Sequence, residues 1–82
     1  MTLKELNFFY KLSDTPQVTQ VAQELKISQS AISLAIKSLE NKLEEQLFDR
    51  VGKKLILNER GRYFKEITLP HYLAIIDSQK LF

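Results

Sequence analysis

Four polar side chains recur at helical spacing near the middle of the chain, and their types suit hydrogen bonding to nucleic acid. Gln29, Ser30 and Ser33 fall close together, and Lys37 follows two turns after the first pair. Glutamine can make paired hydrogen bonds to adenine, serine can bond several bases or a phosphate, and lysine suits a backbone phosphate. Leu34 shares this face and could meet a thymine methyl group or be an ordinary surface leucine. The alternative for the whole face is a merely solvated helix surface.

Cations that could reach phosphates follow this segment, after an acidic cluster. Arg50, Lys53 and Lys54 surround Gly52 in a short connection between two apolar runs. They could contact phosphates or a minor groove, or they could simply keep a hairpin tip and sheet edge soluble. Thr19 is expected to open a short helix as its N-cap, where backbone N–H groups also favour a phosphate. Simple capping is the alternative role for Thr19.

The residues that enzymes and metal sites need are missing from this sequence. His71 is the only histidine and there is no cysteine, so neither a multi-histidine nor a thiolate metal site is available. No glycine-rich phosphate loop occurs, and the serines near residue 30 have no neighbouring base to activate them. We therefore expect no catalytic activity, no metal and no cofactor.

Three helices are predicted to present the polar face. Thr2 and Glu5 fit a capping box for a first helix that runs to about residue 12 or 13. A second, short helix runs from about Thr19 to Leu25, and a tight turn leads to a third helix capped by Ser28. The third helix has the clearest apolar stripe in the chain, which consists of Ala31, Ile32, Ala35, Ile36, Leu39 and Leu43.

A hairpin and a last helix complete the predicted fold. The apolar runs 47–48 and 55–57 flank the connection that contains Gly52, which is typical of a β-hairpin. Asn58 then caps a helix to the end of the chain, and Pro70 should bend or divide it. The predicted fold is mainly α: a three-helix winged helix-turn-helix with a two-stranded β-wing (residues 1–58), followed by a long linker or dimerisation helix (59–82).

The last helix carries apolar side chains too widely spread around its axis for one narrow stripe. Packing on the head should bury one side and leave the other as an exposed patch, which usually marks an interface. We expect this patch to form a homodimer interface, since two-fold dimers are the commonest oligomers. A dimer would also present two heads to two DNA half-sites. A second interpretation, compatible with the first, is that the far end is the cut surface of a longer protein, and we expect the chain to be such a fragment. The expected dimer contacts are Phe64, Ile67, Tyr72, Leu73 and Ile76.

Composition sets wide bounds on function. The chain has 82 residues, 44% hydrophobic and 27% charged, which is ordinary for one small globular domain. A net charge of +2 permits nucleic-acid binding without arguing for it. No apolar run approaches the roughly 20 residues of a membrane span, and no signal-peptide pattern is present. A cytoplasmic location without membrane contact is the default expectation.

The motifs resemble the N-terminal DNA-binding domain of LysR-type transcriptional regulators over nearly the whole sequence. The resemblance is strongest in Ile27-Ser28-Gln29-Ser30-Ala31-Ile32-Ser33 and Ile36-Lys37-Ser38-Leu39-Glu40. Leu47-Phe48-Asp49-Arg50 matches the start of the family's wing, and Asn58 to Gly61 with Leu69-Pro70 matches its linker helix. The sequence departs from the pattern at Leu34, often basic or polar in the family, at Gln46, often glycine, and at Gln20, often basic.

This resemblance implies bacterial transcription control and sequence-specific binding of double-stranded DNA at an inverted repeat. Gln29, Ser30 and Ser33 would lie in the major groove, with Lys37, Arg50 and the wing lysines near the backbone. The linker helices of two chains would pair antiparallel, and a larger domain absent from this chain would bind a small-molecule effector and assemble tetramers. The alternatives are an interaction module that kept the scaffold but reads no DNA, and a different winged-helix DNA-binding family.

Overall fold

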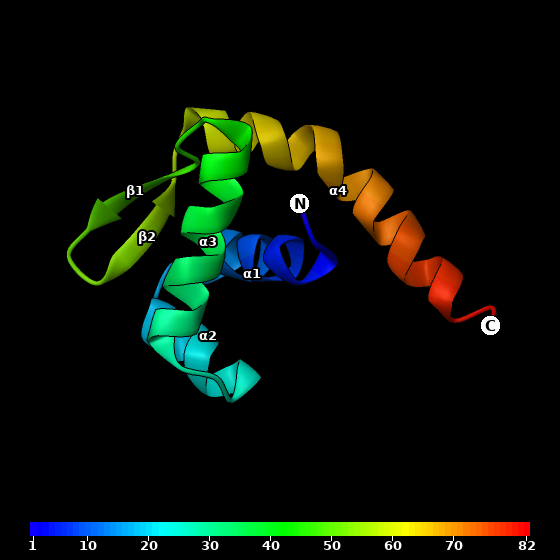
Figure 1. Ribbon diagram of the computed structural model, residues 1–82, viewed down its shortest axis with the longest axis horizontal. Helices are drawn as coiled ribbons and strands as arrows, with labels where there is room; N and C mark the ends of the chain where they lie inside the picture. The colour runs from blue at the N-terminus through cyan, green and yellow to red at the C-terminus, as the bar shows by residue number, and fades with distance from the viewer.

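The computed structural model describes all residues 1–82 and shows a helical head from which one long helix departs (Figure 1). The elements in chain order are α1 (Leu3–Asp14), α2 (Val18–Leu25), α3 (Gln29–Leu43), β1 (Phe48–Val51), β2 (Lys54–Leu57) and α4 (Glu59–Gln79). In Figure 1 the β-hairpin projects from one side of α3, and α4 crosses over the head and runs away from it. The predicted winged helix-turn-helix followed by a C-terminal helix is confirmed.

Side-chain caps begin three of the four helices as the sequence predicted. Thr2 and Glu5 form the reciprocal capping box of α1. Ser28 accepts a hydrogen bond from the backbone N–H of Ala31, and Asn58 accepts one from that of Gly61. These caps satisfy N–H groups that have no partner within the helix, so the starts of α1, α3 and α4 are fixed by local chemistry.

The predicted N-cap of the second helix was wrong. α2 begins at Val18, its N-cap residue is Gln17, and no side chain caps it, so Thr19 is the second helical residue. The reason is tertiary: Gln17 is extended and bridges Lys54, and Pro16 accepts a hydrogen bond from the N–H of Leu55 at 2.9 Å. Pairing with β2 therefore sets the start of α2. α1 also runs one residue further than expected, to Asp14.

The core of the head surrounds Phe9, which is fully buried. The ring of Phe9 makes edge contacts with Tyr10, Phe48 and Phe64 at centroid distances of 5.2, 5.4 and 5.2 Å. These contacts join α1 to the wing and to α4, and aromatic pairs in this geometry stabilise the fold beyond the area they bury. The buried cluster comprises Phe8, Phe9, Tyr10, Leu12, Val18, Val21, Ala22, Ile32, Ile36, Leu39, Leu47, Phe48 and Leu55.

The wing is a two-stranded antiparallel sheet whose register pairs Phe48 with Leu57 and Val51 with Lys54. Gly52 turns the chain with a φ of +62°, a left-handed conformation that glycine adopts without strain. Phe48 and Leu55 point into the core, whereas Asp49 and its exposed neighbours face solvent. The wing is thus attached to the core at its base and free at its tip.

Two residues shape α4. Gly61 is buried, and a Cβ there would overlap the carbonyl oxygen of Leu47 and approach Leu57 Cδ1 to 2.6 Å, so α4 can cross the base of the wing only with glycine at this position. Pro70 lies inside the helix and does not divide it, and the helix axis changes direction along its length in Figure 1. No helix of the molecule combines the length and apolar character of a membrane span.

Candidate nucleic-acid interface

The helix-turn-helix presents one face of α3 to solvent. Lys26 ends α2 in a left-handed conformation, and the N–H of Ile27 donates to the carbonyl of Ala22, which makes the tight turn before α3. Ile32, Ile36 and Leu39 bury the opposite face of α3 in the core. The core therefore packs against one side of α3 and leaves the other side open. Of the predicted reading residues, Gln29, Ser30, Leu34 and Lys37 are exposed and Ser33 is half-buried.

A groove between α3 and the wing brings helix and strand residues together. Ser33 and Lys37 line it from α3, and Arg50 lines it from β1. These three side chains were predicted separately, and the fold places them around one hollow, which is also lined by Ile36, Glu40, Gln46, Phe48 and Leu55. A donor set of this kind suits phosphate oxygens and base edges.

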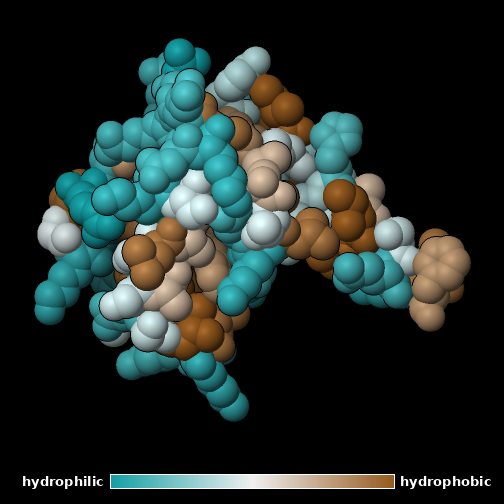
Figure 2. Space-filling model, viewed as in Figure 1, coloured by the Kyte–Doolittle hydropathy of each residue, from teal (hydrophilic) through white to brown (hydrophobic).

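The two wing lysines lie outside this groove. Lys53 is exposed in the turn at the wing tip. Lys54 lines a separate surface with Gln17 and Gln20, close to the start of α2, where Thr19 is also exposed. The predicted cations therefore fall into three places: beside α3, beside the start of α2, and at the wing tip. Hydrophilic side chains cover much of the head in Figure 2, whereas hydrophobic ones gather along α4.

Glu40 fixes the wing beside α3, a role that sequence reasoning missed. Its Oε2 accepts hydrogen bonds from the backbone N–H groups of Leu47 at 2.7 Å and Phe48 at 3.2 Å. The carboxylate is therefore committed to the start of β1, although it lines the same groove as Lys37. In the sequence, Glu40 belongs to the family-like segment Ile36 to Glu40 and to an acidic cluster with Glu44 and Glu45. Nothing in the spacing pointed to this contact.

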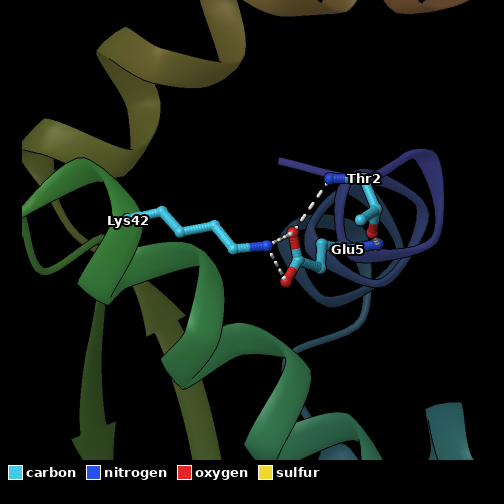
Figure 3. Close-up of polar contacts among 3 residues, drawn as sticks. All are labelled: Thr2, Glu5 and Lys42. Atoms are coloured by element: carbon cyan, nitrogen blue, oxygen red, sulfur yellow. Dashed lines mark hydrogen bonds and ion pairs between the residues drawn. The ribbon is translucent and has the colours of Figure 1, made fainter.

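A second carboxylate, Glu5, ties the other flank of α3 to α1 (Figure 3). Glu5 is 7% exposed and accepts hydrogen bonds from the N–H of Thr2 and from Lys42 Nζ, at 3.0 Å and 3.1 Å for the lysine. The hydrogen bond from the Thr2 backbone lowers the pKa of Glu5 to about 2, and the Lys42 ammonium adds to this effect against the opposing cost of burial. α3 is thus held by a carboxylate on each flank.

The predicted dimer residues of α4 divide between two faces. Phe64 and Tyr72 pack against the core of the head, whereas Ile67 and Leu73 are exposed and Ile76 is half-buried. Tyr63 and Ile75 are two further exposed apolar side chains on α4 that the prediction omitted. A mostly apolar groove beside Tyr63 is lined by Leu43, Glu45, Leu47, Arg60, Tyr63, Phe64 and Ile67.

Tyr10 joins the head to α4 through both its ring and its hydroxyl. The hydroxyl lies 2.6 Å from Thr68 Oγ1, and the ring centroid lies 4.6 Å from that of Tyr72. Burial raises the pKa of Tyr10, so its hydroxyl keeps its proton across the neutral range. Phe64 and the Lys65–Asp14 ion pair, at 3.1 Å, complete this junction.

The fold and the groove define a winged helix-turn-helix domain, and comparison with known proteins gives its family. Residues 3–62 match the family model described as bacterial regulatory helix-turn-helix protein, lysR family. The chain belongs to this family. It is a DNA-binding domain of transcription regulators and not an enzyme.

Individual relatives agree with this assignment. The chain is 42% identical over 77 residues to the HTH-type transcriptional regulator YeiE of Escherichia coli strain K12. The matched region covers 94% of this chain and 25% of that protein. The chain is also 42% identical over 81 residues to the HTH-type transcriptional regulator YwqM of Bacillus subtilis strain 168. That match covers 99% of this chain and 27% of YwqM. The chain thus spans about a quarter of the length of these relatives.

A solved structure with nearly the same extent as this chain is the BenM DNA-binding domain in complex with benA site 1 DNA. It matches with a TM-score of 0.83 at 26% identity, and the match covers 96% of this chain and 91% of that one. The likeness therefore includes α4 as well as the head. This neighbour is bound to DNA.

Proposed function

We propose that this chain reads an inverted-repeat operator in double-stranded DNA as a dimer, with α3 in the major groove and α4 pairing the two copies. The observation that carries the proposal is the groove in which Ser33 and Lys37 of α3 meet Arg50 of the wing. A helix whose apolar side is buried, with polar side chains outward and a cation on the adjacent wing, suits a major groove.

The roles within this interface follow from chemistry and position. Gln29 and Ser30 stand at the N-terminal end of α3, the end that approaches base edges in helix-turn-helix complexes, and are the proposed base readers with Ser33. Lys37 and Arg50 are proposed to grip phosphates beside them, and Lys53 to reach phosphate from the wing tip. Lys54 and Thr19, near the start of α2, are the proposed phosphate contacts at the far edge.

The dimer is proposed to form through the exposed apolar side chains of α4. Ile67 and Leu73 are about half exposed, and an apolar surface of this kind costs free energy until another surface covers it. Two-fold pairing would present two heads to two half-sites. In longer family members, we propose that an additional domain binds a small-molecule effector, and that the protein acts in the bacterial cytoplasm on the nucleoid.

The test is selection from a random pool of duplex DNA with fluorescence-anisotropy binding across a salt series. We expect an enriched inverted repeat and an affinity that falls steeply with salt, because phosphate contacts release counterions. Gln29→Ala should reduce discrimination between operator and random DNA by ~1–3 kcal/mol, with a smaller loss on random DNA. Gln79→Ala, at the far end of α4, is the matched control and should change neither.

Each other outcome has a distinct meaning. Steep salt dependence without enrichment would contradict base reading by α3 and leave only backbone binding. Equal losses on operator and random DNA would contradict the role of Gln29. Absence of binding at low salt would contradict the whole proposal and favour the interaction module, for which exposed Leu34 would then be the natural contact.

A further inference from the structure

Tyr10 holds α4 where that helix is weakest. Pro70 has no N–H group, so the carbonyl of Glu66 lacks its helical partner, and the proline ring crowds the preceding turn. A helix bends most readily at such a residue. Tyr10 contacts Thr68, two residues before Pro70, and Tyr72, two residues after it.

The hydrogen bond between Tyr10 and Thr68 has a defined direction. The Thr68 hydroxyl donates to the carbonyl oxygen of Phe64 at 2.8 Å, and a threonine has one proton to donate. The Tyr10 hydroxyl therefore donates to Thr68 Oγ1. A threonine that bonds back to the residue four positions earlier also favours a helix bend. Both polar partners are satisfied, so the contact is specific to this geometry.

Nothing beyond this contact ties the end of α4 to the head. The Lys65–Asp14 ion pair lies before the bend. No hydrogen bond or ion pair joins residues 73–82 to the head, and Tyr72 is the last α4 residue packed against the core cluster. The direction in which the distal part of α4 leaves the head therefore depends on Tyr10, Thr68 and Tyr72, which we call the bend clamp.

We propose that the bend clamp sets which spacing of two half-sites the dimer accepts. The inference rests on the proposed function, since it needs two heads joined through α4. A rotation of about 10° at the bend moves a point about 20 Å away by about 3.5 Å, close to the rise of one base pair, about 3.4 Å. A clamp that holds the angle of α4 at the bend thus selects a half-site spacing to within one base pair. When the clamp is loosened, the dimer should also accept spacings one base pair longer or shorter.

The experiment measures affinity for duplexes that carry two copies of the selected half-site, with the spacer varied one base pair at a time. Tyr10→Phe keeps the ring and removes the hydroxyl, and Thr68→Val keeps the branched shape and removes its partner. Each should lower the preference for the best spacing over its neighbours about 3- to 10-fold, the worth of one hydrogen bond. Half-site sequence preference should not change. Thr68→Ser, which keeps the hydroxyl, is the matched control and should retain the wild-type spacing profile.

Three results would overturn the clamp while the proposed function stands. The first is an unchanged spacing profile in Tyr10→Phe and Thr68→Val. The second is an equal loss at every spacing, which would indicate a purely structural role, with thermal unfolding of each variant as the check. The third is a Thr68→Ser profile that matches Thr68→Val. A wild-type protein that selects no paired half-sites would instead refute the proposed dimer, and the clamp with it.

Discussion

The head (residues 1–58) and α4 use apolar side chains in opposite ways. In the head, the apolar stripes of α1, α2 and α3 close on one another, and every residue of the buried cluster belongs to residues 1–58. In α4, Gly61 is the only buried residue, and four large apolar side chains are exposed: Tyr63, Ile67, Leu73 and Ile75. The same residue types thus stabilise the monomer in one region and remain available for a partner in the other.

This difference separates stability from assembly along the chain. A side chain that is already buried contributes its burial to the folded monomer, whereas an exposed one contributes only when a second surface covers it. Substitutions in the head should therefore lower the stability of each copy, and equivalent substitutions in the outer face of α4 should weaken association.

The largest effect is expected from two leucines. Leu39→Ala removes a fully buried side chain of α3 and should lower the free energy of unfolding by about 2–5 kcal/mol. Leu73→Ala removes one that is 49% exposed and should lower the stability of the monomer by less than about 0.5 kcal/mol. Urea denaturation at two protein concentrations measures both, since only association makes stability depend on concentration. Equal losses in the two variants would refute the division.

The two glycines test the joint between the regions. Gly61→Ala places a methyl group against the carbonyl of Leu47, so α4 must shift, at a cost of about 1–3 kcal/mol. Gly52→Ala meets no atom within 4 Å, and its cost of about 1–2 kcal/mol comes only from its positive φ. Near-ultraviolet circular dichroism of the packed tyrosines should change for Gly61→Ala alone. An unaltered tyrosine signal in that variant would contradict the close approach.

Two acid–base pairs compare the regions by electrostatics. Glu5→Gln breaks a sheltered contact in the head and should cost about 1–2 kcal/mol at pH 7. Asp77→Asn breaks the exposed ion pair with Lys80 on α4, whose atoms lie 3.7 Å apart. The free energy of unfolding should fall by at most about a few tenths of a kcal/mol. Urea denaturation at pH 7 compares them.

The pH dependence of Glu5 has a definite sign. Its folded pKa is lowered from 4.5 to about 2, so its stabilisation is complete above about pH 4.5 and is lost as the pH falls through about 2. Glu5→Gln should therefore flatten stability against pH in this window, and Asp77→Asn should leave the slope unchanged. A slope in Glu5→Gln equal to that of the wild type would contradict the lowered pKa.

Local patterns predicted much of the head. The stripe of α3 correctly predicted the burial of Ile32, Ile36 and Leu39, because helical periodicity depends on residues a turn apart, but Ala31 of the same stripe is exposed. The caps at Ser28 and Asn58 were predictable for the same reason, since each involves an N–H three residues away. The polar outer face of α3 followed from the same periodicity.

Contacts between distant parts of the chain could not be predicted from local sequence patterns. Thr19 was misplaced because pairing of Gln17 with the wing sets the start of α2. Glu40 binds backbone groups whose position depends on the wing, and Lys42 meets Glu5 37 residues away. In α4 the apolar residues surround the axis, so spacing could not tell Phe64 and Tyr72, which pack inward, from Ile67 and Leu73, which do not.

The smallest expected effect concerns Leu34, an exposed apolar side chain of the head. It is 67% exposed on the proposed reading face of α3, so it resembles the outer residues of α4 more than the core. Its only distinctive partner in a major groove is the C5-methyl group of thymine. We expect that replacing one operator thymine by deoxyuridine, which lacks this methyl, weakens wild-type binding by roughly fourfold, or about 0.8 kcal/mol.

The variants decide whether Leu34 makes that contact. Leu34→Ala should bind the thymine and deoxyuridine operators equally, because the methyl then has no apolar partner. Leu3→Ala, an exposed leucine on α1, should keep the wild-type difference. Anisotropy titrations of each protein against both duplexes complete the cycle. If Leu34→Ala still discriminated at the same thymine, Leu34 would not contact its methyl group, and this exposed leucine would stand, like the outer residues of α4, as a surface without a DNA partner.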